Sequence, residues 1–197
     1  MKPATACERV TPQFLHWTAY CPAVKTDLAS AAYRSAGGWV LIDPIELAPA
    51  AWEEAFGDER PVAVFLTNGN HERAAALYQK TYGIPIHAPA KAADLVLVPD
   101  ARFGEAPVHG LRPVAIPGAT EEETAFLAPE GILFLGDAII NLESHGLALL
   151  PKKYTWNDKA ARASLKKLLD YEFSIVSFAH GTPLRTRAHE RLRALLD

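Results

Sequence analysis

Residues 61–67, PVAVFLT, constrain the fold of this chain most strongly, because they are almost continuously apolar over the length of one strand. A strand with one face in water alternates apolar and polar residues, whereas a continuous apolar run is typical of a strand buried on both faces. The Ala-rich residues 72–82 follow after a short polar turn and predict a helix. The chain is therefore expected to mix buried strands with helices.

The rest of the chain repeats this mixture of apolar runs and turn signals. Further strands are predicted at residues 13–20, 28–35, 39–44, 84–89, 94–100, 111–119 and 173–181. Residues 123–140 predict two strands joined by a tight turn at 129–131. Helices are predicted at 48–56, 157–170 and 184–197, the last with one face buried by Leu184, Leu192, Leu195 and Leu196. Residues 141–156 show no clear element, and we interpret them as a loop that covers Asp137.

The composition limits the classes to which the chain can belong. Its 197 residues suffice for one compact domain with a sizeable core. Apolar residues make up 49%, but no stretch reaches the roughly 20 apolar residues that span a bilayer, which excludes a membrane protein. The formal charge of -3 and the scattered basic residues exclude general binding to nucleic acid. The N-terminus lacks the apolar core of a secretory signal, so we expect a cytoplasmic protein in which Cys7 and Cys21 are packed or exposed thiols.

Polar residues that can carry chemistry stand at the ends of several predicted strands. They are residues 67–73, then Gly136 and Asp137, and finally residues 179–181 with His180. If these strands are neighbours, their ends meet at one edge, which is a common place for a site. A further strand ends at residues 117–120, which neither bind metals nor titrate.

The order of these segments resembles the metallo-β-lactamase superfamily, whose chains pass through an early LID, then T-H-x-H-x-D-H, P-G-H-T, G-D and G-H-G-x-P. The corresponding segments here are VLIDP, LTNGNHER, IPGAT, ILFLGDAI and FAHGTP, between about Trp39 and Pro183. The resemblance implies the α+β class and a four-layer αββα sandwich, in which two mixed β-sheets are flanked by helices within a single domain over residues 1–197. It also implies a site for one or two metal ions, most often zinc, and hydrolysis by a metal-activated hydroxide.

The residues at the first metal's positions depart from the pattern of the superfamily. The resemblance puts Asn68, Asn70 and Ala119 where three His residues bind this metal. Zinc sites use His, Cys, Asp or Glu, because these present a neutral imidazole or an anionic group to the cation. The first metal is therefore expected to be absent.

The positions of the second metal are only partly kept. Its Asp and His fall on Glu72 and Arg73, while the bridging Asp and the last His persist as Asp137 and His180. Arg73 stays positively charged, so it is expected to replace a cation and to form fork-like hydrogen bonds to Asp137 or Glu72. This interpretation favours a non-hydrolytic member of the superfamily, a pseudoenzyme without a metal cofactor, in which Asp137 and His180 are the residual catalytic candidates.

A rebuilt site for a single ion is the alternative. His71, Glu72, Asp137 and His180 are plausible ligands for one Zn, Mn or Fe ion. Against this alternative, His71 falls on a variable position of the motif, where it is expected to point away from the site at a helix N-terminus. His180 is explained equally well by hydrogen bonds to Asp137 and to a backbone carbonyl. Asp43 is expected to fix a turn at the end of its strand.

A third interpretation is a binding protein for a small anionic molecule. Arg73, the nearby helix N-terminus, and Lys152 or Lys153 on the covering loop would bind a carboxylate or a phosphate. Asn68 and Asn70 belong to the same turn, where their side chains are expected to satisfy free backbone N–H groups. The sequence leaves this interpretation open beside the other two.

Overall fold

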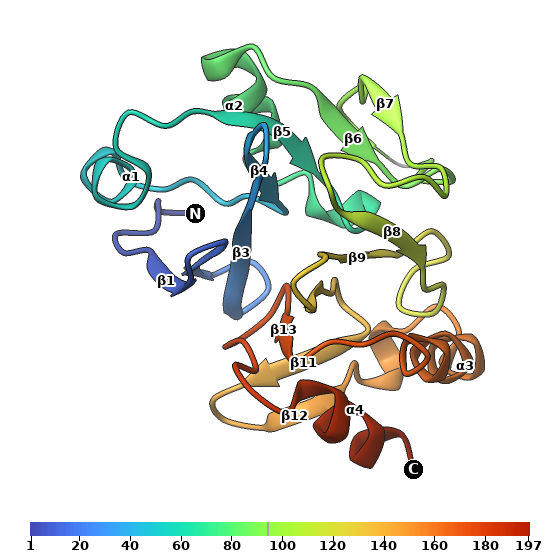
Figure 1. Ribbon diagram of the computed structural model, residues 1–197. Helices are drawn as coiled ribbons and strands as arrows, with labels where there is room; N and C mark the ends of the chain where they lie inside the picture. Colours follow the sequence, from blue (N-terminus) through green and yellow to red (C-terminus); the bar gives the residue numbers. More distant parts are fainter. Residues whose placement is uncertain (94) are drawn as a thin grey trace.

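The computed structural model describes residues 1–93 and 95–197, and its larger sheet contains the N-terminal strands (Figure 1). In order across this sheet the strands are β1 (Glu8–Thr11), β2 (Phe14–Cys21), β3 (Thr26–Ser35), β4 (Gly38–Ile42), β5 (Pro61–Phe65), β6 (Ile86–Ala88) and β7 (Ala101–Arg102). The pairs from β1 to β4 are antiparallel, and the pairs from β4 to β7 are parallel. The sheet is therefore mixed, with its parallel half in the region of the polar turn at residues 67–73.

A smaller mixed sheet comes from the second half of the chain. Its order is β13 (Ile175–Ser177), β10 (Ile132–Phe134), β9 (Thr124–Leu127) and β8 (Arg112–Ala115). Only the pair of β10 and β13 is parallel. A separate antiparallel hairpin is formed by β11 (Ile139–Leu142) and β12 (Gly146–Leu149).

Helices cover the outer face of each sheet. The helices α1 (Pro49–Phe56) and α2 (Ala75–Tyr82) lie against the larger sheet, and α3 (Asp158–Leu168) and α4 (Ala188–Leu196) lie against the smaller one (Figure 1). Two short 3-10 helices, η1 (Gly69–His71) and η2 (Lys152–Tyr154), lie within connections. No helix among the described residues is long and apolar enough to cross a membrane.

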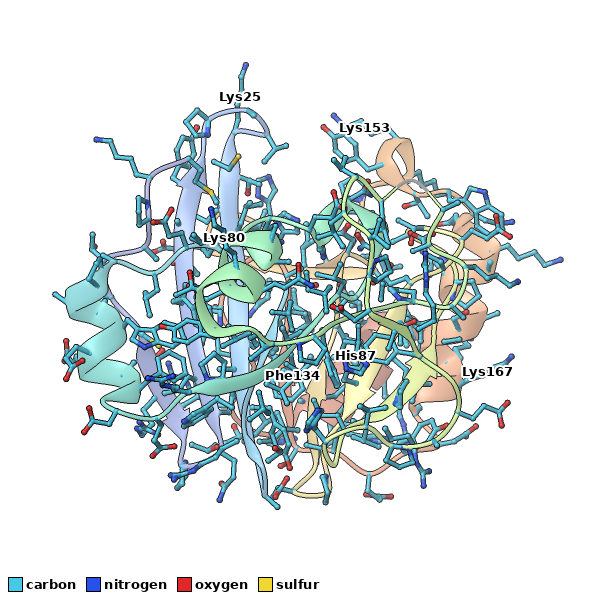
Figure 2. The ribbon with its side chains drawn as sticks, turned by 90° about the horizontal axis from the view of Figure 1, so that it is seen from above. Lys25, Lys80, His87, Phe134, Lys153 and Lys167 are labelled. Carbon is cyan, nitrogen blue, oxygen red and sulfur yellow. The ribbon has the colours of Figure 1, made fainter. Side chains whose placement is uncertain are left out.

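Alternating side chains of β4 show how the layers are held together. Trp39 and Leu41 pack into the apolar cluster under α1 and α2, whereas Val40 and Ile42 pack into the cluster between the sheets. This alternation is the two-residue period of a strand that is buried on both faces. In the central layer Phe134, labelled in Figure 2, packs edge to face against Phe14 of the opposite sheet, with ring centroids 5.2 Å apart. The expected four-layer αββα sandwich is thus confirmed.

Two sequence predictions about elements are wrong. Residues 95–100, the described part of the strand expected at 94–100, form no strand, and Val96 and Val98 are 93% and 86% exposed. Asp94 lies outside the described residues. Residues 141–156, expected to form a loop, instead contain the end of β11, the whole of β12 and then η2. Gly146 permits the hairpin of β11 and β12, because its φ of 68° suits a tight turn.

Candidate metal centre

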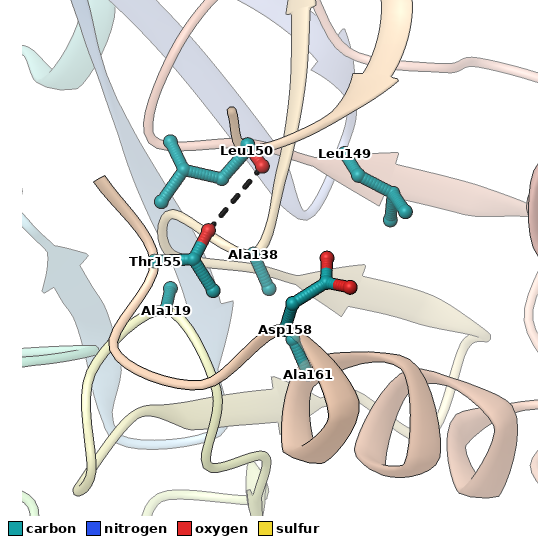
Figure 3. Close-up of a pocket in the computed structure, with 7 residues that line it drawn as sticks. All are labelled: Ala119, Ala138, Leu149, Leu150, Thr155, Asp158 and Ala161. Carbon is teal, nitrogen blue, oxygen red and sulfur yellow. Dashed lines mark hydrogen bonds between the residues drawn. The ribbon is translucent and has the colours of Figure 1, made fainter. Parts of the chain in front are cut away.

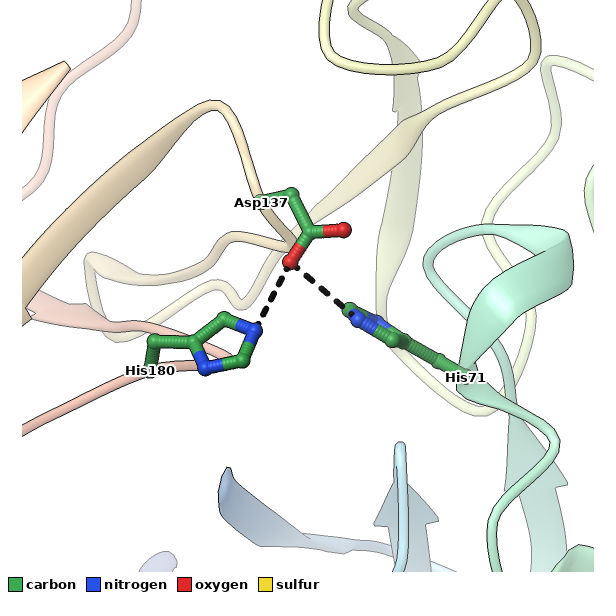
Figure 4. Close-up of side chains that lie close together, drawn as sticks. All are labelled: His71, Asp137 and His180. Atoms are coloured by element: carbon green, nitrogen blue, oxygen red, sulfur yellow. Dashed lines mark ion pairs between the residues drawn. The ribbon is translucent and has the colours of Figure 1, made fainter. Parts of the chain in front are cut away.

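Polar side chains at the ends of parallel strands converge at one edge of the sandwich. Asp43 follows β4 and residues 67–71 follow β5, while Asp137 and His180 follow β10 and β13. Because each of these strand pairs is parallel, the carboxyl ends of its two strands lie at the same edge. The result is a group of three side chains, His71, Asp137 and His180, whose ligand atoms lie within 4.8 Å of one another (Figure 4).

His71 points into this group, so the expectation that it points away is wrong. Its Nε2 lies 3.2 Å from Asp137 Oδ1, and its side chain is only 4% exposed. Its Nδ1 donates to Asp43 Oδ2 at 2.8 Å. Asp43 does more than fix a turn, because its carboxylate also accepts from the backbone N–H and the hydroxyl of Thr67, at 2.8 and 2.6 Å. A carboxylate in this position fixes the orientation and the tautomer of an imidazole.

His180 reaches the same oxygen from the other sheet. Its Nε2 lies 3.1 Å from Asp137 Oδ1, and its Nδ1 donates to the backbone carbonyl of Asp27 at 3.2 Å. The next residue, Gly181, passes so close to β11 that a Cβ on it would lie 2.0 Å from the carbonyl oxygen of Asn141. Both imidazoles are therefore held at Nδ1, and both direct Nε2 toward Asp137.

Asp137 Oδ1 is the point on which the group converges. It is buried, and among the described residues it has no hydrogen-bond partner, because neither imidazole approaches it with hydrogen-bond geometry despite the short distance. The other oxygen, Oδ2, accepts from the side-chain amide of Asn68 at 3.2 Å. Buried polar atoms without a partner are rare in native proteins, and an ion or a water commonly accounts for them. Two nitrogens and one oxygen that lie within 4.8 Å of one another fit the donor set of a cation.

Charges around Asp137 shift the pKa of each buried neighbour. Burial lowers the pKa of His71, but the carboxylates of Asp137 and Asp43 outweigh burial and raise the pKa to about 9. Burial raises the pKa of Asp137, yet the charge of His71 and the close contact with His180 hold it well below its usual value. Burial and the charge of Asp137 raise the pKa of Glu123 to about 8. Both shifts favour the protonated form, that of His71 between two carboxylates and that of Glu123 beside Asp137.

Arg73 does not make the contact predicted from the sequence. Its Nη1 donates to the carbonyls of Ala29 and Asp43 at 2.5 and 2.9 Å, and its Nη2 donates to the carbonyl of Ala179 at 3.3 Å. Within the described part of the chain, its guanidinium forms no ion pair with Asp137 or Glu72. Backbone oxygens take the hydrogen bonds that were expected to go to carboxylates.

Glu72 lies apart from the convergent group, although it was counted among the ligands for a single ion. Its Oε1 accepts from the backbone N–H of Leu97 at 2.7 Å. The group of ligand atoms within reach of one another contains His71, Asp137 and His180 without Glu72. The side chain of Glu72 thus holds the segment after residue 94 against the polar turn.

The other predicted positions have local partners. Asn68 caps η1, since its Oδ1 accepts from the backbone N–H of Asn70 at 2.9 Å, as the sequence predicted. Ala119 lines a cavity of about 10 Å³ beside Ala138, Leu150 and Thr155 (Figure 3).

The two lysines of the anion-binding interpretation lie on the exposed helix η2. Lys152 Nζ is 3.6 Å from Asp158 Oδ2, and Lys153 Nζ lies 4.6 Å from the ring centroid of Tyr154. Figure 2 shows Lys153 at the outer surface of the molecule. Lys152 is thus paired with the first residue of α3, and Lys153 lies over a ring of its own helix η2.

Sequence reasoning missed Glu123, which is fully buried beneath Asp137. Its Oε1 accepts from the backbone N–H of Ala138 at 3.0 Å, and its Oε2 has no hydrogen-bond partner among the described residues. Glu123 is the last of three consecutive Glu residues, so the local sequence does not distinguish it from its exposed neighbour Glu121. Asp43 was detectable, because a carboxylate directly after a buried strand is a signal for a site.

Comparisons with known proteins establish the family and the fold of the chain. The family model of the metallo-beta-lactamase superfamily matches residues 8–196. A metallo-beta-lactamase from Pontibacter korlensis is 16% identical, with 96% of this chain and 97% of that chain covered and a TM-score of 0.75. One from Erythrobacter litoralis, solved with beta mercaptoethanol in the active site, is 17% identical, with 96% and 95% covered and a TM-score of 0.77.

A third similar structure is the metallo-beta-lactamase FIM-1 from Pseudomonas aeruginosa in its mono-zinc form. It is 16% identical, with 99% of this chain and 95% of that chain covered, and its TM-score is 0.72. No curated protein matches the sequence. At such low identities the solved structures establish the fold, whereas the family model spans nearly the whole chain. This chain belongs to the metallo-β-lactamase superfamily.

Proposed function

We propose that this protein is a metal-dependent hydrolase whose centre holds a single divalent cation through His71, Asp137 and His180. The observation that carries the proposal is the convergence of two Nε2 atoms on the buried Asp137 Oδ1, which has no hydrogen bond of regular geometry among the described residues. Each imidazole is fixed by a hydrogen bond at its Nδ1, which is the usual arrangement of metal-binding histidines. A bound cation would lower the pKa of a water to about 7 and polarise a carbonyl or phosphoryl oxygen.

Two imidazoles and one carboxylate limit the choice of metal. This donor set is found in zinc hydrolases and in non-haem iron sites. The absence of a thiolate from the group is consistent with Zn, Mn or Fe. A similar solved structure is described as a mono-zinc form, which supports the view that this fold can hold one ion. Asn68, Asn70, Ala119 and Arg73 at the remaining positions support a single ion over a pair.

The surrounding residues of this chain have definite tasks in the proposed centre. Asp43 would keep a proton of His71 on Nδ1, so that Nε2 could bind the cation once its own proton is lost. Asn68 donates to Asp137 Oδ2, so Oδ1 would remain available to bind the cation. Protons compete with cations for His71, because ligand imidazoles must be neutral. The raised pKa of Glu123 next to Asp137 favours its neutral form, which limits the negative charge of the site.

A second candidate is a non-hydrolytic protein that binds no metal. One observation favours it: the His71 imidazolium lies between Asp43 and Asp137 and can supply the positive charge that a metal would bring. In this interpretation His71, rather than Arg73 as predicted from the sequence, supplies the positive charge that replaces a metal ion. The anion-binding interpretation is weaker, because the two terminal nitrogens of Arg73 already donate to backbone carbonyls.

Chelator-sensitive hydrolysis separates these candidates. The protein, loaded in turn with Zn(II), Mn(II) and Fe(II), is assayed against generic ester, thioester, phosphodiester and β-lactam substrates, with and without EDTA. The proposal predicts activity with at least one substrate class that EDTA abolishes and that falls at least 100-fold in His71→Ala and His180→Ala. His145→Ala, an exposed histidine on the turn between β11 and β12, is the matched control. Activity that survives EDTA or both substitutions contradicts the proposal.

A further inference from the structure

We propose that Arg73 is the positioning residue of this centre: its guanidinium holds the backbone segments that set the orientation of His71 and His180. The inference rests on the proposed single-metal function and deepens it. Arg73 donates from Nη1 to the carbonyls of Ala29 and Asp43 and from Nη2 to that of Ala179. One side chain thus ties together segments that are far apart in the sequence.

Each of these three carbonyls lies next to a group that fixes an imidazole. Asp43 supplies the carboxylate that holds His71 Nδ1. Ala179 directly precedes His180 in the sequence. A displacement of either segment would therefore move an imidazole Nε2 relative to Asp137.

The third carbonyl, that of Ala29, belongs to β3 and links the Arg73 guanidinium to this strand. The backbone N–H of Ala29 donates to the carbonyl of Ala179 at 2.8 Å, and the carbonyl of Asp27 holds His180 Nδ1. Two hydrogen bonds thus join β3 to residues 179–180 beside the Arg73 guanidinium. Release of the guanidinium would remove one donor from each of these three carbonyls and loosen this junction, although Ser30 Oγ would still donate to Asp43 and Ala29 N–H to Ala179.

The backbone of Arg73 is itself specialised for this position. Its φ is 40°, a conformation that residues other than Gly rarely adopt. The turn ends the polar segment after η1, and Ala74 N–H donates to the carbonyl of Pro44 at 2.9 Å. The expected helix accordingly starts at Ala75, three residues later than the sequence pattern predicted. Uncommon backbone conformations persist where the surrounding structure holds them, and they concentrate at functional sites.

A lysine would perform this task less well than an arginine. The guanidinium presents five N–H donors in a planar fork and reaches several acceptors at once, whereas an ammonium acts as a compact point charge. Arg73→Lys therefore keeps the positive charge and loses part of the geometry. Arg73→Met removes both.

The test compares Arg73→Met and Arg73→Lys with a matched arginine. Arg102 on β7 also donates to two backbone carbonyls, those of Pro89 and Ala92, but β6 separates its strand from β5. For each protein, the affinity for Co(II) is measured by chelator competition, and the visible absorption spectrum of the Co(II) form is recorded. The spectrum reports the ligand geometry, and a purely structural role would not change it.

The inference predicts that the variants lose Co(II) affinity to different degrees. Co(II) affinity falls about 10- to 100-fold in Arg73→Met, the range typical of residues that orient metal ligands, and the spectrum changes. Arg73→Lys recovers part of the affinity. Arg102→Met loses thermal stability but keeps the affinity and the spectrum of the parent protein.

Other results would overturn the inference. Parental affinity and spectrum in Arg73→Met, or equal losses of affinity in Arg73→Met and Arg102→Met, overturn the inference and leave the proposed function intact. A parent protein that binds no Co(II) overturns both proposals. If Arg73→Met does not fold by circular dichroism, Arg73→Lys decides by the same criteria: a changed spectrum supports the inference, and an unchanged one overturns it.

Discussion

Replacing His16 with Phe is expected to make the free energy of unfolding less dependent on pH in acid solution. His16 lies on β2, is 5% exposed, and among the described residues both of its ring nitrogens have no hydrogen-bond partner. Burial, with a smaller contribution from Arg185, lowers the pKa of His16 from 6.5 to about 4 despite the opposing charge of Glu8. The folded protein therefore keeps this imidazole neutral at a pH at which the unfolded chain protonates it.

The magnitude follows from linkage between protonation and folding. Between pH 6.5 and 4 the unfolded chain binds more protons than the folded protein, so the free energy of unfolding rises with pH in that window and levels off above it. A difference of about 2.5 pKa units, at about 1.4 kcal/mol for each unit, corresponds to roughly 3 kcal/mol lost by pH 4. Phe carries no proton and keeps the edge-to-face packing against Phe14.

Urea denaturation at several pH values measures this effect. The difference in unfolding free energy between His16→Phe and the parent protein is expected to grow by about 3 kcal/mol from pH 7 to pH 4, in favour of the variant. Taking this difference cancels the titration of other groups, which both proteins share. His145→Gln, at an exposed position, is the control and should track the parent protein. A difference that is constant over this range refutes the reasoning.

Two further substitutions test the centre and its packing. Asp43→Asn is expected to weaken Zn(II) binding about 10- to 100-fold in chelator competition, because a neutral amide accepts the Nδ1 proton of His71 less strongly than a carboxylate does. Asp58→Asn on the surface is the control, and equal affinity in both variants would contradict the role of Asp43. Gly136→Ala is expected to cost about 1–3 kcal/mol in urea denaturation, because its Cβ would lie 2.7 Å from Thr67 Oγ1. Gly104→Ala, whose Cβ meets no atom within 4 Å, should cost less, and equal losses would refute the steric argument.

Strong patterns in the sequence were enough to predict buried strands and helices, and the resemblance to the superfamily predicted their layers. The continuous apolar run at residues 61–67 became the buried strand β5, and the mixed sheets and flanking helices agree with the resemblance to the superfamily. The run at residues 94–100 misled, since exposed Val96 and Val98 show that apolar character alone does not ensure burial. Burial depends on what the rest of the chain places over a segment, and this information is not local.

The site was only partly predictable for a related reason. Asp137 and His180 stand at strand ends and match motifs, so the sequence singled them out. The direction of His71 depends on Asp43, a residue 28 positions away, and on the 3-10 turn of η1. The partners of Arg73 are backbone carbonyls, which every residue possesses, so no sequence pattern marks them.

The most direct test of the single-metal centre is the metal-to-protein ratio. The purified protein is equilibrated with Zn(II), freed of excess metal by gel filtration and measured by elemental analysis, together with His71→Ala and the control His145→Ala. We predict one equivalent of zinc in the parent protein and in His145→Ala, and a small fraction of an equivalent in His71→Ala. Two equivalents, none, or one that persists without His71 would contradict the proposed centre.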